Sequence, residues 1–297
     1  MSAKRIKVIL NPYAGRWKAK KHIEPLRETL AQLGFRVDLT VTRTPGEGIG
    51  VARQAAQAGF AAVVAAGGDS TVSEVVNGLV QAAGNGEAGT LGIVPLGTAN
   101  DLSDMLGIPR DWRVACRRLL AGETRVIDVC RVNDRYFGNN SAVGLEPMVT
   151  LEAERIQRIK GPVRYIVAAL RAISRSPHWQ ARLRWDGGSF EGPVTLVSVG
   201  NSPRTGGAFF MTPKAKLDDG LMDFVFAPAL GRLSLLRLLP ATFSGRHIRH
   251  RAVIYCTTTR LHIEMEPSPL QADGEVIDRQ ATRIEYAILP RKLRVIV

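Results

Sequence analysis

Residues 60–71 read Phe-Ala-Ala-Val-Val-Ala-Ala-Gly-Gly-Asp-Ser-Thr, an apolar run that ends in two glycines and an acid. The run from Phe60 to Ala66 is apolar on both faces, as is typical of a central strand in a parallel sheet that helices cover on both sides. An amphipathic helix is predicted directly after it, from the spacing of Val72, Val75, Val76, Leu79 and Val80. Residues 60–80 therefore predict a strand, a loop and a helix of an α/β domain.

The same alternation continues on both sides of this segment. Further strands are predicted at residues 6–10, 36–41 and 91–94, with helices after the first two. Beyond about residue 127 strands dominate, at 126–132, 194–199, 221–226, 252–257 and 261–266, with helical insertions at 151–174 and 233–243. We predict an N-terminal three-layer α/β nucleotide-binding domain over 1–127 and a mainly antiparallel β-sandwich over 128–297, whose last strand or so could return to the first domain.

Composition limits the partners and the compartment. The chain has 297 residues, 45% of them hydrophobic, a net charge of +13 and a pI near 10.2, which together favour a globular protein with an anionic partner. No apolar run approaches the roughly 20 residues that cross a bilayer, and the N-terminus has no signal-peptide pattern. The three cysteines are widely separated, which suits reduced thiols. We expect a cytoplasmic protein.

The loop Gly67-Gly68-Asp69-Ser70-Thr71 lies where strand ends form ligand crevices in open α/β sheets. Adjacent glycines let backbone N–H groups approach an anion, and the following helix start adds unpaired N–H groups, so phosphate is expected here. Asp69 would hold the magnesium that a nucleotide triphosphate brings. The alternative is an ordinary turn in which Thr71 is the N-cap and Glu74 completes a capping box.

Two more loops follow predicted strands at the same sheet edge. Gly97 and Thr98 follow residues 91–94, and the spacing from Thr98 to Asp101 repeats the hydroxyl-x-x-acid pattern of a helix start. The turn from Asn11 to Gly15 ends the first strand. Three loops of this kind favour a nucleotide site over three unrelated turns, although each alone would also suit a plain turn.

In the second domain, Lys216-Leu217-Asp218-Asp219-Gly220-Leu221 leads into a strand, and Asp273-Gly274-Glu275 lies between two strands. Asp-Gly is a favoured hairpin turn, so both segments suit plain turns. The functional alternative uses their carboxylates for a second metal and for a base that accepts a proton from an attacking alcohol. No P-loop of the G-x-x-x-x-G-K-[ST] type is present, which disfavours the P-loop folds.

Taken together, these five motifs resemble the diacylglycerol kinase catalytic domain family in order and spacing: Asn11-Pro12-Tyr13-Ala14-Gly15, Gly67-Gly68-Asp69-Ser70-Thr71, Pro95 to Asp101, Leu217-Asp218-Asp219-Gly220 and Asp273-Gly274-Glu275. The resemblance covers nearly the whole chain. It implies an α/β nucleotide domain, a β-sandwich, a cleft between them, and transfer of phosphate from ATP to a lipid hydroxyl.

The resemblance also implies roles for individual residues. Glu275 would accept the proton, and Asp69 would organise the catalytic metal. A Mg²⁺ ion would be held by Asp219 with the backbone carbonyls of Lys216 and Leu221. ATP would lie against Asn11, Pro12, Gly15, Thr42, Gly67, Gly68, Asp69, Ser70, Thr71, Glu74 and Thr98, while Asn100 and Asp101 would order the region near the phosphates.

One departure from the family pattern is Ser70, where glycine is usual. If this position needs a positive φ, serine costs of order 1 kcal/mol. One alternative is therefore a catalytically weakened lipid- or nucleotide-binding protein. A second alternative, independent of Ser70, is an NAD kinase-like enzyme, which has a similar glycine loop and two domains. A nucleic-acid binder is disfavoured because aromatic residues are only 6% of the chain and do not interleave with basic ones.

A lipid kinase must reach a membrane, and basic amphipathic helices are typical of proteins that lie at its surface. Residues 155–175 and 232–251 both combine arginines with apolar residues at helical spacing. We expect reversible docking of these segments on the anionic inner face of the membrane, although core-facing apolar stripes would look the same. The sequence allows an oligomer without requiring one.

Overall fold

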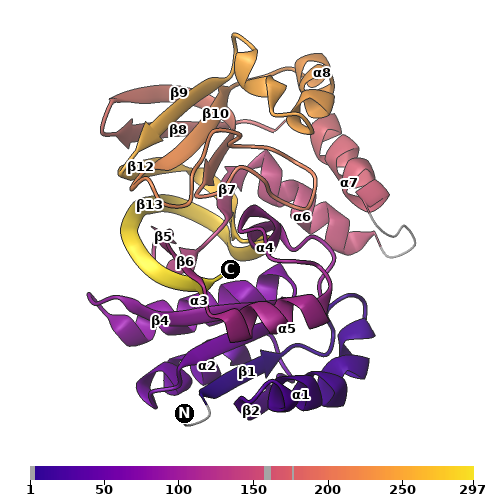
Figure 1. Ribbon diagram of the computed structural model, residues 1–297. Helices are drawn as coiled ribbons and strands as arrows, with labels where there is room; N and C mark the ends of the chain where they lie inside the picture. The colour runs from indigo at the N-terminus through magenta and orange to yellow at the C-terminus, as the bar shows by residue number, and fades with distance from the viewer. Residues whose placement is uncertain (1–3, 157–161, 176) are drawn as a thin grey trace. The chain divides into compact units, whose positions relative to one another are not determined.

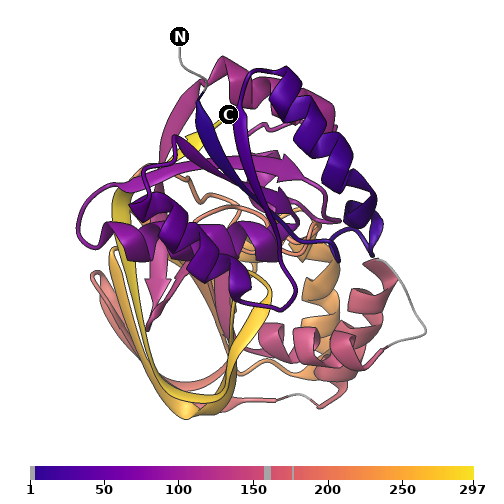
Figure 2. The same cartoon turned by 90° about the horizontal axis from the view of Figure 1, so that it is seen from below.

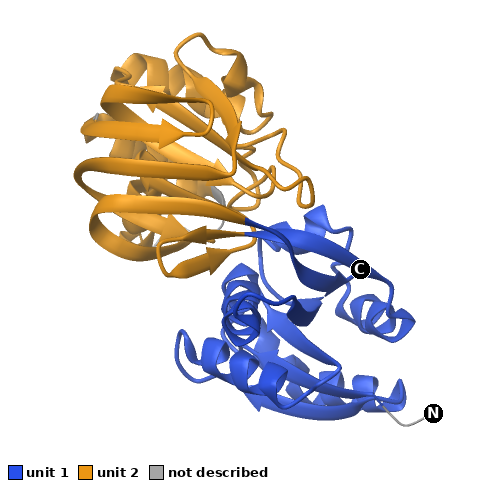
Figure 3. Cartoon of the chain, turned by 90° about the vertical axis from the view of Figure 1, so that its left-hand side faces the viewer, with its two compact units in different colours: residues 1–129, 289–297 blue, residues 130–288 orange. Residues whose placement is uncertain are grey.

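The computed structural model describes residues 4–156, 162–175 and 177–297, which form two compact units (Figure 3). Unit 1 contains residues 1–129 and 289–297, and unit 2 contains residues 130–288. Within the described ranges, no helix combines the length and the apolar character needed to cross a bilayer.

Unit 1 is built on a parallel sheet with the strand order β2-β1-β3-β4-β13 (Figure 1). Its strands are β1 (Arg5–Leu10), β2 (Arg36–Val41), β3 (Ala62–Gly67), β4 (Ala88–Pro95) and the end of the long strand β13 (Glu275–Ile296). Every residue of β3 is buried, as the unbroken apolar run predicts for a strand at the centre of such a sheet.

Helices cover both faces of this sheet (Figure 2). On one face, Leu26 and Leu30 of α1 (Ile23–Gln32) and Cys116 of α5 (Trp112–Ala121) pack with alternate residues of the strands. On the other face, α2 (Glu47–Gln57) and α3 (Asp69–Ala83) pack against the sheet and against each other. The short helices η1 (Lys18–His22) and α4 (Asp101–Met105) complete the described helices of unit 1.

Unit 2 is an antiparallel β-structure with the strand order β11-β10-β9-β7-β12-β13. Its strands are β6 (Arg135–Phe137), β7 (Asn140–Gly144), β8 (Trp179–Trp185), β9 (Gly188–Gly200), β10 (Met222–Pro228), β11 (Ile254–Thr258), β12 (Arg260–Ala272) and the first part of β13, and β5 (Thr124–Val132) passes into it from unit 1.

Two long strands connect the layers of unit 2. The first half of β9 pairs with β8, and its second half pairs with β7 and β10. In the same way, β12 pairs with β8 before Glu266 and with β7 after Ser268, and its register with β13 shifts between these halves. The strands enclose an apolar core that includes Phe137, Phe224 and Tyr286.

The helices of unit 2 are α6 (Leu145–Arg155), α7 (Pro162–Arg175), α8 (Arg232–Thr242) and the short η2 (Arg246–Arg249). The prediction of one helix over residues 151–174 is wrong. The backbone of Ile156 is extended and ends α6, and residues 157–161 of the predicted helix lie outside the described residues. The strands at residues 135–137, 140–144 and 179–185 were not predicted.

Candidate active site

The loops of unit 1 that carry the glycine motifs leave the sheet side by side. The amide of Asn11, after β1, donates to the carbonyl of Ala66 at 3.1 Å, and the amide of Leu96, after β4, donates to the carbonyl of Gly67 at 2.8 Å. Thr42 follows β2, is buried, and its amide donates to the carbonyl of Leu10 at 2.9 Å. The structure thus brings together the three loops that were predicted to share one sheet edge, and Thr42, which the family resemblance implied, follows a fourth strand beside them.

Glycine is required in these loops because the backbones touch. A Cβ on Gly68 would lie 3.2 Å from the Cα of Gly97, and a Cβ on Gly97 would collide with the Cα of Gly68. Gly15 has φ 58°, and a Cβ there would lie 2.6 Å from the carbonyl oxygen of Leu96. These glycines therefore allow the three loops to pack together.

Asp69, at the start of α3, joins two of the loops. Its Oδ2 accepts a hydrogen bond from the amide of Asn100 at 2.8 Å, and its Oδ1 accepts one from the amide of Asp101 at 2.6 Å. Asn100 is buried, has φ 52°, and its side chain bonds both the amide and the carbonyl of Gly97 at 3.2 Å. The carboxylate of Asp69 thus stabilises a strained loop start, a role that the sequence analysis missed.

The alternative capping boxes are wrong. Helix α3 begins with Gly68 as N-cap, not Thr71, and Asn100 is the N-cap of α4, not Thr98. Glu74 instead accepts hydrogen bonds from the amides of Gly46 and Gly48, both at 2.8 Å, and so stabilises the first turn of α2. Through Glu74, the helix that follows the Gly67-Gly68 loop holds the neighbouring helix in place.

Ser70 does not have the strained backbone considered above. It lies exposed in the first turn of α3 and is not among the residues with positive φ. The conformation that could penalise a side chain occurs instead at Asn100. Among the other predicted ATP contacts, Thr98 is exposed, Pro12 and Thr71 are buried, and the side chain of Asn11 accepts the amide of Tyr13 at 2.9 Å.

In unit 2, Asp273 and Gly274 form the two-residue turn of a hairpin that pairs Ala272 with Glu275. Both turn residues have positive φ, 48° and 82°, which is typical of a type I′ turn. The side chain of Glu275 is 50% exposed, and Arg135 donates to its Oε2 at 2.8 Å. The turn therefore presents a carboxylate to solvent beside one fixed cation, which the sequence analysis did not identify.

Asp273 anchors this turn to the strand behind it. Its Oδ1 accepts the amides of Asn139 and Asn140 at 3.0 and 3.2 Å, and its Oδ2 accepts the amide of Gly138 at 3.2 Å. Asp273 donates its own amide to the carbonyl of Asn140 at 2.7 Å. The backbone position of Glu275 is thus tied to β7.

The predicted metal site lies on an exposed turn before β10. Oδ1 of Asp219 accepts the amide of Leu221 at 3.1 Å, and Gly220 has φ 75°. In the part of the chain that the structure describes, no three His, Cys, Asp or Glu side chains gather as a metal cluster, so an ion here would need backbone carbonyls and water as further ligands. One carboxylate with carbonyls is a donor set that suits Mg²⁺.

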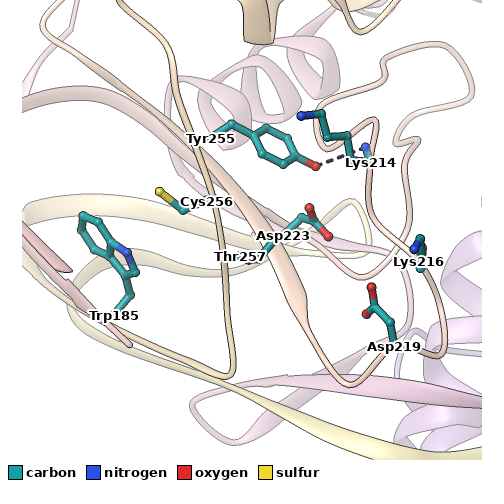
Figure 4. Close-up of a pocket in the computed structure, with 8 residues that line it drawn as sticks. All are labelled: Trp185, Lys214, Lys216, Asp219, Asp223, Tyr255, Cys256 and Thr257. Carbon is teal, nitrogen blue, oxygen red and sulfur yellow. Dashed lines mark hydrogen bonds between the residues drawn. The ribbon is translucent and has the colours of Figure 1, made fainter. Parts of the chain in front are cut away.

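A pocket of about 620 Å³ adjoins this turn (Figure 4). It is lined by both acidic and basic groups, including Asp219, Asp223, Lys214 and Lys216. Burial, and to a lesser degree the charge of Asp219, raises the pKa of Asp223, although a hydrogen bond from Tyr255 opposes the shift. A cation bound at Asp219 would offset the repulsion between these two carboxylates.

The two units match known families. Residues 5–132 match the diacylglycerol kinase catalytic domain, and residues 140–297 match the YegS C-terminal NAD kinase beta sandwich-like domain. A diacylglycerol kinase of Bacillus subtilis is 30% identical over 275 residues, covering 92% of this chain and 90% of the relative. One of Staphylococcus carnosus is 28% identical over 274 residues, with 92% and 89% covered.

Solved structures share the fold over the full chain. A diacylglycerol kinase from Bacillus anthracis has a TM-score of 0.74 at 21% identity, covering 100% of this chain and 97% of that one. An NAD kinase from Archaeoglobus fulgidus in complex with ATP has a TM-score of 0.57 at 14% identity, covering 99% and 93%. The fold and the paired domains define a kinase with an α/β domain and a β-sandwich, as predicted from the sequence. The chain belongs to the diacylglycerol kinase catalytic domain family.

Proposed function

We propose that the protein is an ATP-dependent lipid kinase that transfers the γ-phosphate to a hydroxyl of a diacylglycerol-like lipid. The observation that carries this proposal is the carboxylate of Asp69, which holds the amides of Asn100 and Asp101 and so fixes two glycine loops at one sheet edge. Fixed backbone amides at strand ends and helix starts suit a polyphosphate. The names of the relatives from B. subtilis and S. carnosus supply the class of acceptor.

In this proposal the chemistry is divided between the two units. The loops that contain Asn11, Gly68 and Gly97 bind the phosphates of ATP, with Thr42 and Thr98 completing the nucleotide site. Glu275 accepts the proton of the lipid hydroxyl while its oxygen attacks the γ-phosphorus and the bond to the β-phosphate oxygen breaks, releasing ADP. Because Arg135 holds Oε2 of Glu275, we assign Oε1 as the proton acceptor.

A divalent cation, which we propose to be Mg²⁺, would neutralise charge that develops on the phosphates. Asp219 with the carbonyls of Lys216 and Leu221 would hold one ion, and Asp69 would order the catalytic one. The exposed carboxylate of Asp219 fits such an ion, since it directly precedes Gly220, beside which no other atom lies within 4 Å of an added Cβ.

The test of this function is phosphorylation by the parent protein and by Glu275→Gln. With magnesium-ATP and diacylglycerol in mixed micelles, we expect labelled lipid from the parent and at least about 100-fold less from the variant, because an amide cannot accept the proton. ATP binding, measured by calorimetry, should be unchanged. Equal labelling by both proteins would reject the role of Glu275, and phosphorylation of NAD in place of lipid would reject the choice of acceptor.

We also propose that helices α7 and α8 bind reversibly to an anionic membrane. Ala172 and Ile173 of α7 pack with Leu235 and Leu238 of α8. The two helices also expose large apolar residues, with Leu233 the most exposed at 71%: Val163, Ile166, Leu170, Leu233 and Leu236. The two helices lie side by side in Figure 1.

Arginines surround these exposed apolar residues. Arg171 on α7 and Arg232 and Arg237 on α8 are exposed. This combination of exposed leucines and arginines is typical of helices that lie in the membrane interface, where each cation contributes about 1 kcal/mol near an anionic leaflet. Co-sedimentation with vesicles of defined anionic lipid content measures this binding.

A further inference from the structure

A buried carboxylate lies behind the hairpin that carries Glu275. Glu146 is the second residue of α6, directly after β7. Gly144, the N-cap of α6, has φ 85°, and a Cβ there would lie 2.7 Å from the carbonyl oxygen of Thr195, so β7 ends tightly against β9. The amide of Gly144 also donates to Ser268 of β12 at 3.0 Å. These contacts fix where α6 begins and therefore where Glu146 lies.

One side chain connects Glu146 with the hairpin turn. The buried Gln271 donates from Nε2 to Oε1 of Glu146 at 3.1 Å and to Oδ1 of Asn140 at 2.6 Å. At the other end of the same amide, Oε1 of Gln271 accepts the amide of Gly274 at 2.8 Å. Gly274 directly precedes Glu275. A chain of three hydrogen-bonded groups thus runs from the carboxylate of Glu146 to the turn that presents Glu275.

The chemistry of the amide makes this connection directional. A glutamine amide has donors only on Nε2 and acceptors only on Oε1. If it rotated by half a turn, its oxygen would face the acceptors of Glu146 and Asn140, and its NH₂ group would face the amide donor of Gly274. A charged acceptor strengthens a hydrogen bond relative to a neutral one, so ionised Glu146 holds Gln271 in its present orientation.

We propose that Glu146 is a positioning residue that acts through Gln271 to hold the turn bearing Glu275. The proposal rests on the role of Glu275 in the proposed function. In this role Glu146 does not touch the reacting groups; it restrains the backbone from which the proton acceptor projects. A small displacement of such a group has large effects on rate, because the proton must be accepted at hydrogen-bond distance.

The environment of Glu146 supports a change of charge in the working range of an enzyme. Burial raises the pKa of Glu146 to about 7, although Ser198, Asn140 and Gln271 oppose the shift. Its Oε2 is buried and, within the described residues, accepts no hydrogen bond. The restraint on Gln271 should therefore be strong above neutral pH and weaker below it.

Other ionisable groups near Glu146 come from three elements. Tyr286 of β13 bonds Ser141 at 3.1 Å, and burial, with a smaller contribution from the charge of Glu146, raises its pKa. Helix α7, packed against α6, carries Arg164, Arg171 and Arg175, of which Arg175 pairs with Glu152 of α6 at 2.7 Å. The groups of β7, β9 and β12 that bond this site are uncharged: Asn140, Ser198 and Gln271. Glu146 is therefore the group we expect to titrate here.

The test compares Glu146→Gln, Gln271→Met and the double variant with the parent, using diacylglycerol in mixed micelles across neutral pH. At alkaline pH we expect Glu146→Gln to lower kcat about tenfold, with the KM values for ATP and lipid within about twofold of the parent. The parent's kcat should fall as the pH drops through about 7, and this step should be absent in Glu146→Gln. Glu146→Asp should restore part of the rate.

Two further comparisons separate positioning from other effects. The double variant should be no slower than the slower single variant, because both changes break the same connection. The control Glu154→Gln, an exposed acid on the same helix α6, should behave as the parent. Since ionising a buried acid costs stability, Glu146→Gln should unfold no more easily than the parent at alkaline pH, which excludes a loss of rate through misfolding.

The outcomes distinguish this inference from the proposed function. If Glu275→Gln keeps the parent's activity, the proposed function fails. If Glu275→Gln is inactive while Glu146→Gln keeps the parent's kcat and pH profile, only the positioning role fails. A raised KM for lipid at unchanged kcat would make Glu146 a binding residue and would also overturn the inference.

Discussion

At the scale of single residues, the carboxylate of Asp69 holds a neighbouring loop in place by accepting two of its backbone amides. An acidic residue after two glycines suggests a metal ligand, but both oxygens of this side chain accept backbone amides from the neighbouring loop. Those hydrogen bonds hold Asn100 at a positive φ that is uncommon for a residue with a side chain. The carboxylate is thus part of the framework that orients the loops.

Replacing Asp69 with asparagine should disrupt this framework. An amide offers one acceptor oxygen, and its NH₂ group would face either the amide of Asn100 or that of Asp101. We expect the free energy of unfolding to fall by about 1–3 kcal/mol and kcat/KM for ATP to fall by about 100-fold. Urea unfolding and steady-state kinetics measure the two effects.

The control for this prediction is Glu28→Gln, an exposed charge on α1 in the same unit. It should change neither quantity. If Asp69→Asn retained the parent's stability while losing activity, the framework role would be wrong, and only the proposed role of Asp69 toward the metal would remain.

At the scale of elements, α2 and α3 pack closely against each other because glycines lie at their contact. A Cβ on Gly78 of α3 would lie 2.6 Å from the Cβ of Ala52 on α2, which is too close for two carbon atoms. Gly48 of α2 in turn leaves space for Glu74, which caps α2. Helix α3, which starts at the Gly67-Gly68 loop, is therefore positioned by small residues that have no reactive side chain.

Two glycine-to-alanine variants test this packing. Gly78→Ala should destabilise the protein by about 1–3 kcal/mol, because the added methyl group must push the helices apart. Gly50→Ala, on α2 with no atom within 4 Å of the added Cβ, should stabilise it by about 1 kcal/mol through helix propensity. Thermal unfolding measures both, and equal effects at the two positions would contradict the packing argument.

The sequence predicts those elements whose apolar pattern is unambiguous. Residues 36–41 form β2 as predicted, and the fully apolar run at 60–66 corresponds to β3. A strand was expected after the Asp273-Gly274-Glu275 turn, but its bounds were not predicted, because β13 changes environment along its length, with charged residues at most outward positions. At Arg291 its φ is 50°, and the amide there donates to Asp128 at 2.6 Å. A long-range contact of this kind leaves no local pattern.

The difference between local pattern and long-range contact also decides which parts of the site the sequence predicts. Loops that follow apolar strands, such as Gly67-Gly68 and Gly97, can be recognised because position along the chain gives their place at the sheet edge. Arg135, Glu146 and Gln271 cannot, since they meet Glu275 or its turn only through strand pairing. Local spacing also suggested the two capping boxes. In the structure Glu74 instead accepts the amide of Gly46 from another element, and the start of α4 is bound by Asp69 of α3.

At the scale of the whole molecule, the net charge of +13 should govern how the protein reaches a lipid substrate. Exposed charges are screened by salt within about 8 Å at physiological ionic strength, whereas contacts of apolar side chains are not weakened in this way. Binding that combines both should therefore weaken with salt and also depend on exposed leucines such as Leu233 and Leu236.

We expect the parent protein to co-sediment with vesicles that contain anionic lipid and to be released as salt rises toward about 0.5 M, where the Debye length falls to a few ångströms. Leu233→Gln combined with Leu236→Gln should weaken binding about tenfold or more, because both side chains lose apolar contact with the bilayer. Leu120→Gln, on α5 of unit 1 and 50% exposed, is the matched control and should bind like the parent. Kinase activity on neutral mixed micelles should be the same in all three proteins. Equal binding to neutral and anionic vesicles would contradict the role of charge, and an equal loss in Leu120→Gln would contradict the choice of α8 as the membrane-binding surface.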